Sequence, residues 1–460
     1  MNLIRSYLTG RGYTLPSEKW DKSVALFLSW YRGSVGGFHS YYVFNGTRRV
    51  KAHRYSMQMA KRVCEEHAAL LLNERVNIQA EGFDDLPEVL ERLRFFELGN
   101  KLVERAYALG TGAFVEYRNA DGLPCMDFVA ADMIYPLRWE GDAVTECAFA
   151  SHVTVDGKPG YYVQIHTLSD DQTYRIENAW LNEDGRPAPP QNGVETVVET
   201  GCPVPLFQLF APAAVNNLLD GCPMGMSIFG NAIDCLKAVD ELFTSYVTEF
   251  TLGRKRLMVP LSKATIQVEQ SGQMQPRFDP SDALFYVYEQ SPDGKSDLKE
   301  TGGSLRANEH ETGLQSMLDA MSAACGLGYG YFKARGQGAA KTATEVISEK
   351  SDLYQTMKRN EKPLERAING MVRALAYLCG KSPEISVTVT FDTSIVEDAE
   401  RTMNENIRLC DARLRSRKRA VMEIDHVDEE EAERRLADIA KEQDVSQSAV
   451  EDFILGGERA

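Results

Sequence analysis

The apolar positions between residues 342 and 380 recur at steps of three, four and seven, which places them on one face of a single long helix. They are Val346, Leu353, Met357, Leu364, Ile368, Met371, Leu375 and Leu378. Thr342 and Glu345 have the spacing of a capping box at its start, and Gly380 supplies a stop. With a rise of about 1.5 Å per residue, such a helix spans roughly 58 Å. Pro363 lies mid-way along it and predicts a kink, because proline lacks the N–H of the helical hydrogen bond.

Shorter stretches of the chain carry the same helical periodicity. They predict helices over residues 19–31, 55–74, 85–110, 227–252, 305–325, 395–415 and 427–443. His67 lies on the apolar face of the second of these stretches. A histidine there could be a metal ligand or a base, but a side chain at the edge of the core is the far commoner case. We therefore expect His67 to be structural.

Between Gly112 and Thr200 the hydrophobic period changes to two, and turn sequences separate short alternating segments. This pattern predicts an antiparallel meander. Turn chemistry explains the aspartates of the region better than metal binding does; these are Asp121, Asp132, Asp142 and Asp156. Residues 201–224 are rich in proline and are predicted to be irregular. A second β-rich stretch, 254–301, lies between two predicted helices, and one strand is predicted over 384–391. The fold class is therefore α+β.

Composition narrows the classes of function. The net charge of −16 is unlike that of a general nucleic-acid binder, which is normally basic. The nine cysteines are scattered without a C-x-x-C pair, which indicates reduced thiols in a cytosolic protein. No apolar run approaches the roughly 20 residues of a membrane span, and the first residues lack the apolar core of a signal peptide.

The loop over residues 334–342 resembles a phosphate-binding loop in composition but not in spacing. The phosphate-binding motif needs glycine at two positions that Arg335 and Ala340 occupy here. Nucleotide binding is therefore disfavoured. Lys333, Arg335 and Lys341 instead make a positively charged, glycine-rich loop, which suits either transient contact with a polyanion or a plain solvated surface.

The sequence has no recognisable nucleophile or metal signature. A basic cluster over residues 413–419 could bind nucleic acid. More often such a run is a solvated turn or pairs with nearby acidic residues, such as those at 429–431. Catalytic, cofactor-binding and metal-binding residues are accordingly not expected.

The order of these parts resembles that of the portal proteins of tailed bacteriophages, of the type found in long-tailed phages and prophages. The resemblance extends over residues 15–443 and begins with Trp20, Trp30 and Tyr31. Its other carriers are SMQMAKRVCEEHAALLLNE, GMSIFGNAIDCLKAVDELFTSYVTEF, KTATEVISEKSDLYQTMKRNEKPLERAINGMV and SRKRAVMEIDHVDEEEAERRL. The resemblance is carried by the combination and order of these segments, since none is a catalytic motif.

The resemblance implies a portal-type fold with a β-rich wing, paired stem helices, a small clip, a long kinked helix and a helical crown. The implied parts are a wing (1–224, helices plus meander), a stem helix (225–253), a β-rich clip (254–301), a second stem helix (302–332), a tunnel loop (333–341), the long helix with a strand (342–394), and a crown with a tail (395–460).

The resemblance also assigns roles to single residues. The implied DNA-facing loop residues are Lys333, Arg335, Gln337 and Lys341. The residues that cap and kink the long helix are Thr342, Glu345 and Pro363. The clip residues implied to dock the motor and neck proteins are Arg254, Lys255, Arg256, Tyr286 and Tyr288.

As a function, the resemblance implies a non-enzymatic ring, usually of twelve copies, at one vertex of the capsid. Such a ring conducts double-stranded DNA without sequence specificity during packaging and ejection. Its implied partners are the terminase large subunit, head-completion or neck proteins, scaffold and major capsid protein, with no cofactor and no membrane. The implied location is the virion, and the host cytoplasm during assembly. The alternatives are another neck or baseplate component of the virion, and a nucleotide-using packaging enzyme that would need the loop at 334–342.

Overall fold

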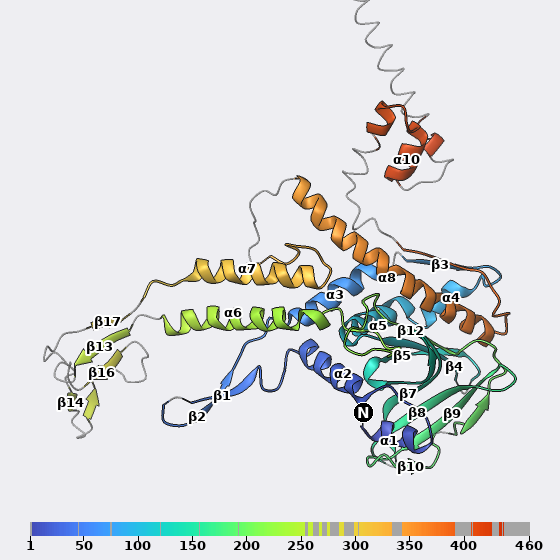
Figure 1. Ribbon diagram of the computed structural model, residues 1–460, viewed down its shortest axis with the longest axis horizontal. Coiled ribbons are helices and arrows are strands. Elements are labelled where there is room, and N and C mark those ends of the chain that lie inside the picture. The colour runs from blue at the N-terminus through green and yellow to red at the C-terminus, as the bar shows by residue number, and fades with distance from the viewer. Residues whose placement is uncertain are drawn as a thin grey trace, which may run out of the picture. The chain divides into compact units, whose positions relative to one another are not determined.

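The computed structural model describes residues 2–44, 46–73, 76–119, 121–155, 157–191, 193–253, 256–260, 266–268, 274–276, 285–288, 299–301, 303–333, 343–391, 406, 408–425, 432–434 and 436. The chain forms two compact units, Met1–Thr390 and Phe391–Ala460. The first unit mixes helices and sheets, as the sequence predicts (Figure 1).

The first five helices belong to the N-terminal part of the first unit. They are α1 (Asn2–Gly10), α2 (Glu18–Tyr31), α3 (Met59–Leu71), α4 (Leu86–Arg92) and α5 (Phe95–Leu109). The helical block predicted over 85–110 consists of α4 and α5, which are separated where Arg94 adopts a left-handed φ of 52°. The sequence pattern did not predict α1. Its Ile4 and Leu8 are completely buried in a core cluster with side chains of the large sheet.

The predicted meander forms two antiparallel sheets instead of one. The larger has the order β10 (Pro187–Ala188), β9 (Tyr174–Leu181), β8 (Lys158–Leu168), β7 (Ala143–Val155) and β6 (Ile134–Glu140), with β11 (Val197–Glu199) also paired to β9. The smaller places β4 (Gly112–Arg118) between β12 (Phe207–Phe210) and β5 (Pro124–Ala130). A 3₁₀ turn, η1 (Ala131–Met133), joins the two sheets.

Strand β12 corrects the prediction that residues 201–224 are irregular throughout. Its four residues pair with β4, so that Phe207 lies opposite Val115 and Phe210 lies opposite Gly112. A strand this short, with a partner almost 100 residues away, leaves no periodic signal in its own sequence.

Helices α6 (Ile233–Leu252) and α7 (Ala307–Ala324) pack against each other. Short strands lie between them in the chain: β13 (Arg256–Pro260), β14 (Ile266–Val268), β15 (Met274–Pro276), β16 (Phe285–Tyr288) and β17 (Lys299–Thr301). Strand β13 pairs with β16 in parallel and with β17 antiparallel. The prediction of a β-rich insertion between two helices is thus confirmed. The first helix begins at Ile233 and not at residue 227, because a turn and η2 (Gly230–Ala232) precede it.

The long helix of the prediction is α8 (Ala343–Leu378), which is 36 residues long and continues through Pro363. It packs on β12 and β4 with a stripe of buried side chains; these include Leu364, Ile368, Met371, Val372 and Leu375. A kink at Pro363 stays a prediction. After α8, β18 (Val387–Thr390) pairs antiparallel with β3 (Asn77–Ala80), within the predicted strand over 384–391.

In the second unit the basic cluster at 413–419 leads into α10 (Arg417–Asp425). Lys418 forms an ion pair of 2.5 Å with Glu433, and Arg415 donates a 2.6 Å hydrogen bond to Asn406. At least these two cations therefore pair within the unit. The acidic residues at 429–431, and most of the helices predicted over 395–415 and 427–443, lie outside the described residues.

Glu116 is an ionisable side chain buried in the first unit without a partner. It lies on β4 with no exposed surface, and neither carboxyl oxygen has a hydrogen-bond partner. Burial raises the pKa of Glu116 from 4.5 to about 8. The carboxyl group is therefore protonated in the folded protein at neutral pH, whereas in the unfolded chain it is charged.

This difference makes the stability of the wild type depend on pH. The folded state binds the extra proton, so the free energy of unfolding should fall as pH rises from about 4.5 to about 8, by up to about 1.4 kcal/mol per unit. Glu116→Gln should remove this contribution to the pH dependence of the free energy of unfolding. Denaturant unfolding of both proteins across this range measures it, since the other titrating groups cancel in the comparison. If the free energy of unfolding of the two proteins changes with pH in parallel, Glu116 is not protonated in the folded protein at neutral pH.

Candidate functional site: the anchored helix pair

The structure describes only some of the residues to which the resemblance assigned roles. Lys333 is exposed after α7, and Pro363 is half-buried within α8. Arg256 opens β13, while Tyr286 and Tyr288 lie on β16 opposite Met258 and Pro260. Glu345 lies in the first turn of α8. The remaining residues are outside the described ranges: Arg254, Lys255, Arg335, Gln337, Lys341 and Thr342.

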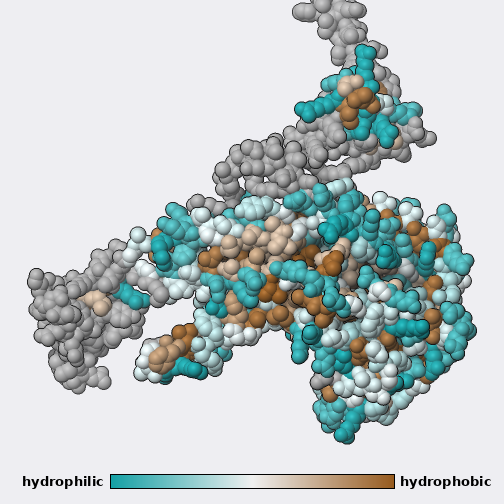
Figure 2. Space-filling view, in the orientation of Figure 1, coloured by the Kyte–Doolittle hydropathy of each residue, from teal (hydrophilic) through white to brown (hydrophobic). Residues whose placement is uncertain are grey.

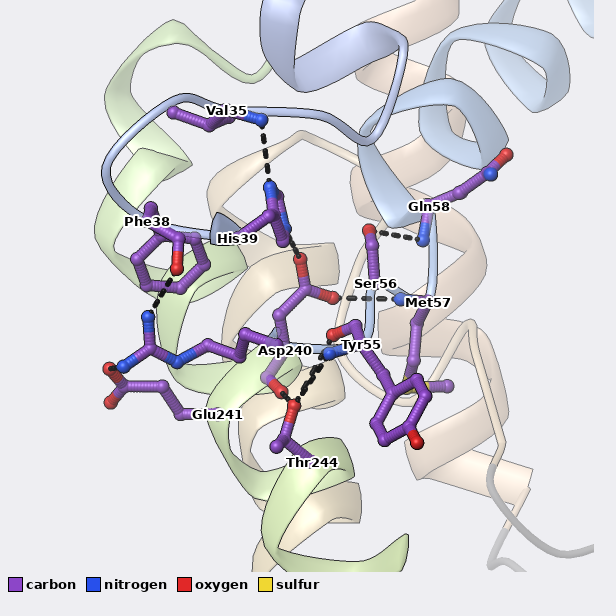
Figure 3. A network of polar contacts seen from close by, with 11 residues as sticks. Val35, Phe38, His39, Tyr55, Ser56, Met57, Gln58, Asp240, Glu241 and Thr244 are labelled. Carbon is purple, nitrogen blue, oxygen red and sulfur yellow. Dashed lines mark hydrogen bonds and ion pairs between the residues drawn. The ribbon is translucent and has the colours of Figure 1, made fainter. Parts of the chain in front are cut away.

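The described site is the anchorage of the α6–α7 pair, and its centre is Asp240 on α6 (Figure 3). The carboxylate is almost completely buried. Its Oδ1 accepts a 2.8 Å hydrogen bond from the backbone N–H of Met57, and its Oδ2 lies 2.9 Å from His39 Nε2. The Val35 N–H donates to His39 Nδ1 at 2.8 Å, so the imidazole proton is on Nε2 and is donated to Asp240. A buried carboxylate is satisfied in this way by two N–H donors from residues 35–58.

The segment after His53 is fixed to the same helix by further contacts. The Tyr55 N–H donates to Thr244 Oγ1 at 2.9 Å, and that hydroxyl donates to the Asp240 carbonyl at 2.8 Å. Arg54 forms a 3.3 Å ion pair with Glu241 and donates to the Phe38 carbonyl. Its guanidinium also lies 4.4 Å from the centre of the Phe38 ring. The two chain segments that flank residues 40–53 are therefore attached to successive turns of α6.

The C-terminal end of α7 is anchored to α3 in a similar way. His67 is completely buried, and its Nε2 donates a 2.9 Å hydrogen bond to the Cys325 carbonyl. Burial lowers the pKa of His67 to about 4, which keeps the imidazole neutral. A few residues on, the Tyr331 hydroxyl donates to Glu66 at 2.8 Å. The prediction that His67 is a structural core residue is confirmed.

Glu249 joins the C-terminal end of α6 to the N-terminal end of α7. Its carboxylate accepts from the Arg306 side chain, at 3.2 Å from Nε and 2.8 Å from Nη2, and from the Arg306 backbone N–H. These hydrogen bonds lower the pKa of Glu249 to about 2. The last turn of α6 and the residue before α7 are thus paired, as an antiparallel arrangement of the two helices requires.

A separate cavity of about 550 Å³ lies between the sheets and the end of α8. Aromatic side chains line it, namely Tyr117, Tyr162, Trp180 and Tyr377. Its polar groups bond to one another: the Tyr162 hydroxyl donates to Asn178 at 2.7 Å, and Tyr117 to Asp127 at 3.3 Å. Burial raises the pKa of Asp127. The sequence pattern singled out none of these lining residues.

A signal for the anchorage was present in the sequence, but only in part. Asp240 stands on the apolar face of the helix predicted over 227–252, next to Leu236 and Phe243, and a carboxylate in that place needs a partner. His39 lies 201 residues away in the chain, so no local pattern connects the two residues.

Two possible kinds of site receive no support within the described ranges. No group of histidine, cysteine, aspartate and glutamate side chains among these residues has the arrangement of a metal site. Nor does any described helix combine the length and the apolar character that crossing a membrane requires.

The fold and these contacts define a protein in which an antiparallel helix pair is anchored by buried polar groups to a body of helices and sheets. The family model described as "Phage portal protein, SPP1 Gp6-like" matches residues 26–445. The chain therefore belongs to this phage portal protein family. Membership of this family makes it a structural protein of the phage portal.

Two solved structures of gene transfer agent particles contain chains to which this chain is similar. One is the neck of a native gene transfer agent particle, computed with C12 symmetry; its chain is 12% identical with a TM-score of 0.40, covering 79% of this chain and 89% of that chain. The other is the virion of a native gene transfer agent particle, at 12% identity and a TM-score of 0.40, covering 80% and 89%. A comparison with curated proteins finds no match.

The anchorage makes a prediction about Asp240. Asp240→Ala leaves the Met57 N–H and His39 Nε2–H buried without an acceptor, which should lower the free energy of unfolding by about 2 to 5 kcal/mol. Asp234→Ala is the matched control, because Asp234 lies on the same helix with its side chain 92% exposed; its cost should stay under about 1 kcal/mol. Denaturant unfolding measures both variants. Equal, small losses would mean that the network does not anchor α6.

Proposed function

We propose that this chain forms a ring of about twelve copies that serves as the portal of a tailed phage particle. The observation that carries the proposal is the family match over residues 26–445, together with the anchored antiparallel pair α6–α7. In the proposed ring, the helix pairs surround an axial channel through which double-stranded DNA passes during packaging and ejection.

The charge of the chain suits a channel through which DNA must slide. Each phosphate that a protein neutralises strengthens its hold on DNA, so a strongly basic channel would retain its cargo. A chain with a net charge of −16 repels phosphates in general. In this proposal the loop at 333–341, with Lys333, Arg335 and Lys341, supplies a few cations that steady the duplex locally.

The strands between α6 and α7 are the proposed docking part. We assign residues 254–301 to contacts with the terminase large subunit during packaging and with neck proteins afterwards. Initiation of capsid assembly with scaffold and major capsid protein is part of the same proposal. These roles need no catalytic group, which agrees with the structural nature of the family.

The size and shape of the purified particle test the ring directly. A monomer has a mass of 51.4 kDa, so a ring of about twelve copies should sediment with a mass near 600 kDa. Negative-stain images should show rings with a central hole. A monomer at every concentration, or filaments and sheets in place of rings, would reject the portal and favour another component of the virion.

The proposed loop makes a prediction that separates assembly from packaging. Changing Lys333, Arg335 and Lys341 to alanine together should leave the rings intact, yet lower the amount of DNA packaged in an assay with capsids and motor. Lys19, Lys22 and Lys101 are three cations far from the loop in the sequence, and their change to alanine is a control with the same loss of charge. If both triple variants package DNA like the wild type, the loop has no role in guiding it.

A further inference from the structure

The hairpin formed by β1 (Ser40–Phe44) and β2 (Arg49–His53) exposes large apolar side chains. Tyr42 is 70% exposed, Phe44 65% and Val43 42%. Figure 2 shows apolar surface on this hairpin, at the place where Figure 1 labels β1 and β2. An isolated two-stranded hairpin is marginally stable in water, and monomeric proteins seldom expose such aromatic clusters. Its exposed residues therefore favour a covering partner.

The register of the hairpin gives it two different faces. Tyr42 lies opposite Lys51 and Phe44 opposite Arg49, so one face combines two aromatic rings with two cations. Tyr41, Val43, Val50 and Ala52 make the other face, which is apolar. The strands and their turn, residues 40–53, carry three cations and no carboxylate, in a chain whose net charge is −16.

The hairpin is held rigidly at its base. His39 immediately precedes β1 and bonds to Asp240, while Arg54 and Tyr55 immediately follow β2 and bond to Glu241 and Thr244. The base is therefore fixed to α6 at both ends of the hairpin, and the direction of the hairpin is set in advance. Pre-organised elements of this kind lose little entropy when they bind.

The pair α6–α7 has the complementary composition. The two helices together contain seven carboxylates and one lysine; of these carboxylates, Asp240 is buried and Glu249 is paired with Arg306. Asp234, Glu241 and Glu309 are exposed, and so is the apolar side chain of Phe250. In its own copy the pair leaves Tyr42 and Phe44 uncovered. A positive, aromatic hairpin and a negative helix pair can therefore meet between copies, where opposite charges also select the orientation of docking.

We propose that the β1–β2 hairpin of one copy docks on the α6–α7 pair of the next copy in the ring. This inference rests on the proposed ring, in which each copy would offer a hairpin to one neighbour and receive a hairpin from the other. Duplex DNA is the less favoured partner, because its bases are stacked and offer no surface to Tyr42 and Phe44.

Two hairpin variants and one control test the inference. Arg49→Glu with Lys51→Glu reverses the charge of the aromatic face, and Tyr42→Ser with Phe44→Ser removes its rings. Rings dissociate when the protein is diluted below a certain concentration. Each variant should raise this concentration by about tenfold or more, as measured by mass photometry. Lys19→Glu with Lys22→Glu gives the same change in net charge on α2 and should leave that concentration within about twofold of the wild type. Near-ultraviolet circular dichroism checks that each variant is folded.

Cross-linking of the wild type gives a second readout that does not depend on a variant. Rings are assembled from equal amounts of ¹⁴N- and ¹⁵N-labelled chains and treated with a zero-length carbodiimide. Lys51 should couple to carboxylates of α6 or α7, and the coupled peptides should carry mixed isotopes. Coupling within one isotope only, or to other acids only, would overturn the inference.

The outcomes separate this inference from the proposed function. A wild type that never forms rings rejects the portal function itself. Wild-type rings accompanied by hairpin variants that assemble equally well reject only the docking of the hairpin. Variants that keep their rings but lose retention of DNA on a filter would instead assign the hairpin to DNA.

Discussion

The arrangement of the first unit depends on the hydrogen bonds that the buried carboxylate of Asp240 accepts. A charge with almost no exposure is tolerated only when hydrogen bonds replace the lost water. Here the replacements are the Met57 N–H and the Nε2–H of His39, both from outside α6. The need to satisfy one carboxylate therefore fixes residues 35–58 to the helix, and with them the base of the β1–β2 hairpin.

The anchorage also connects the helix pair to the long helix α8. The C-terminal end of α7 is held to α3 through His67, and the chain then turns at Gly326, which has a φ of +76°. A Cβ at this glycine would lie 2.9 Å from Thr356 Cγ2 on α8. The turn can thus approach α8 only because the residue is a glycine. The turn that follows α7 therefore lies directly against α8.

Much of this fold follows from local patterns, and the rest depends on distant partners. Helix α8 was predictable because its apolar face repeats over ten turns, and α7 because Leu314, Leu318 and Met321 recur at helical spacing. The β1–β2 hairpin was missed, since aromatic residues occupy consecutive positions of β1 and hide the alternation. Asp240 was visible as a carboxylate on an apolar face. Its partner His39 was not, because the fold alone brings residues 201 positions apart together.

In the proposed ring, strongly acidic copies must meet side by side, and the proposed docking of the hairpin would make such a contact favourable. Each copy carries a net charge of −16, so neighbouring copies repel one another unless their contact surfaces differ in charge from the average. In a heterologous ring, one surface of each copy meets a different surface of the next, so a local positive patch suffices if it meets a negative one. In the proposed docking, residues 40–53 would provide the positive patch and α6–α7 the negative one. On this account the excess negative charge can face the channel and repel DNA, while the cations needed for closure lie between copies.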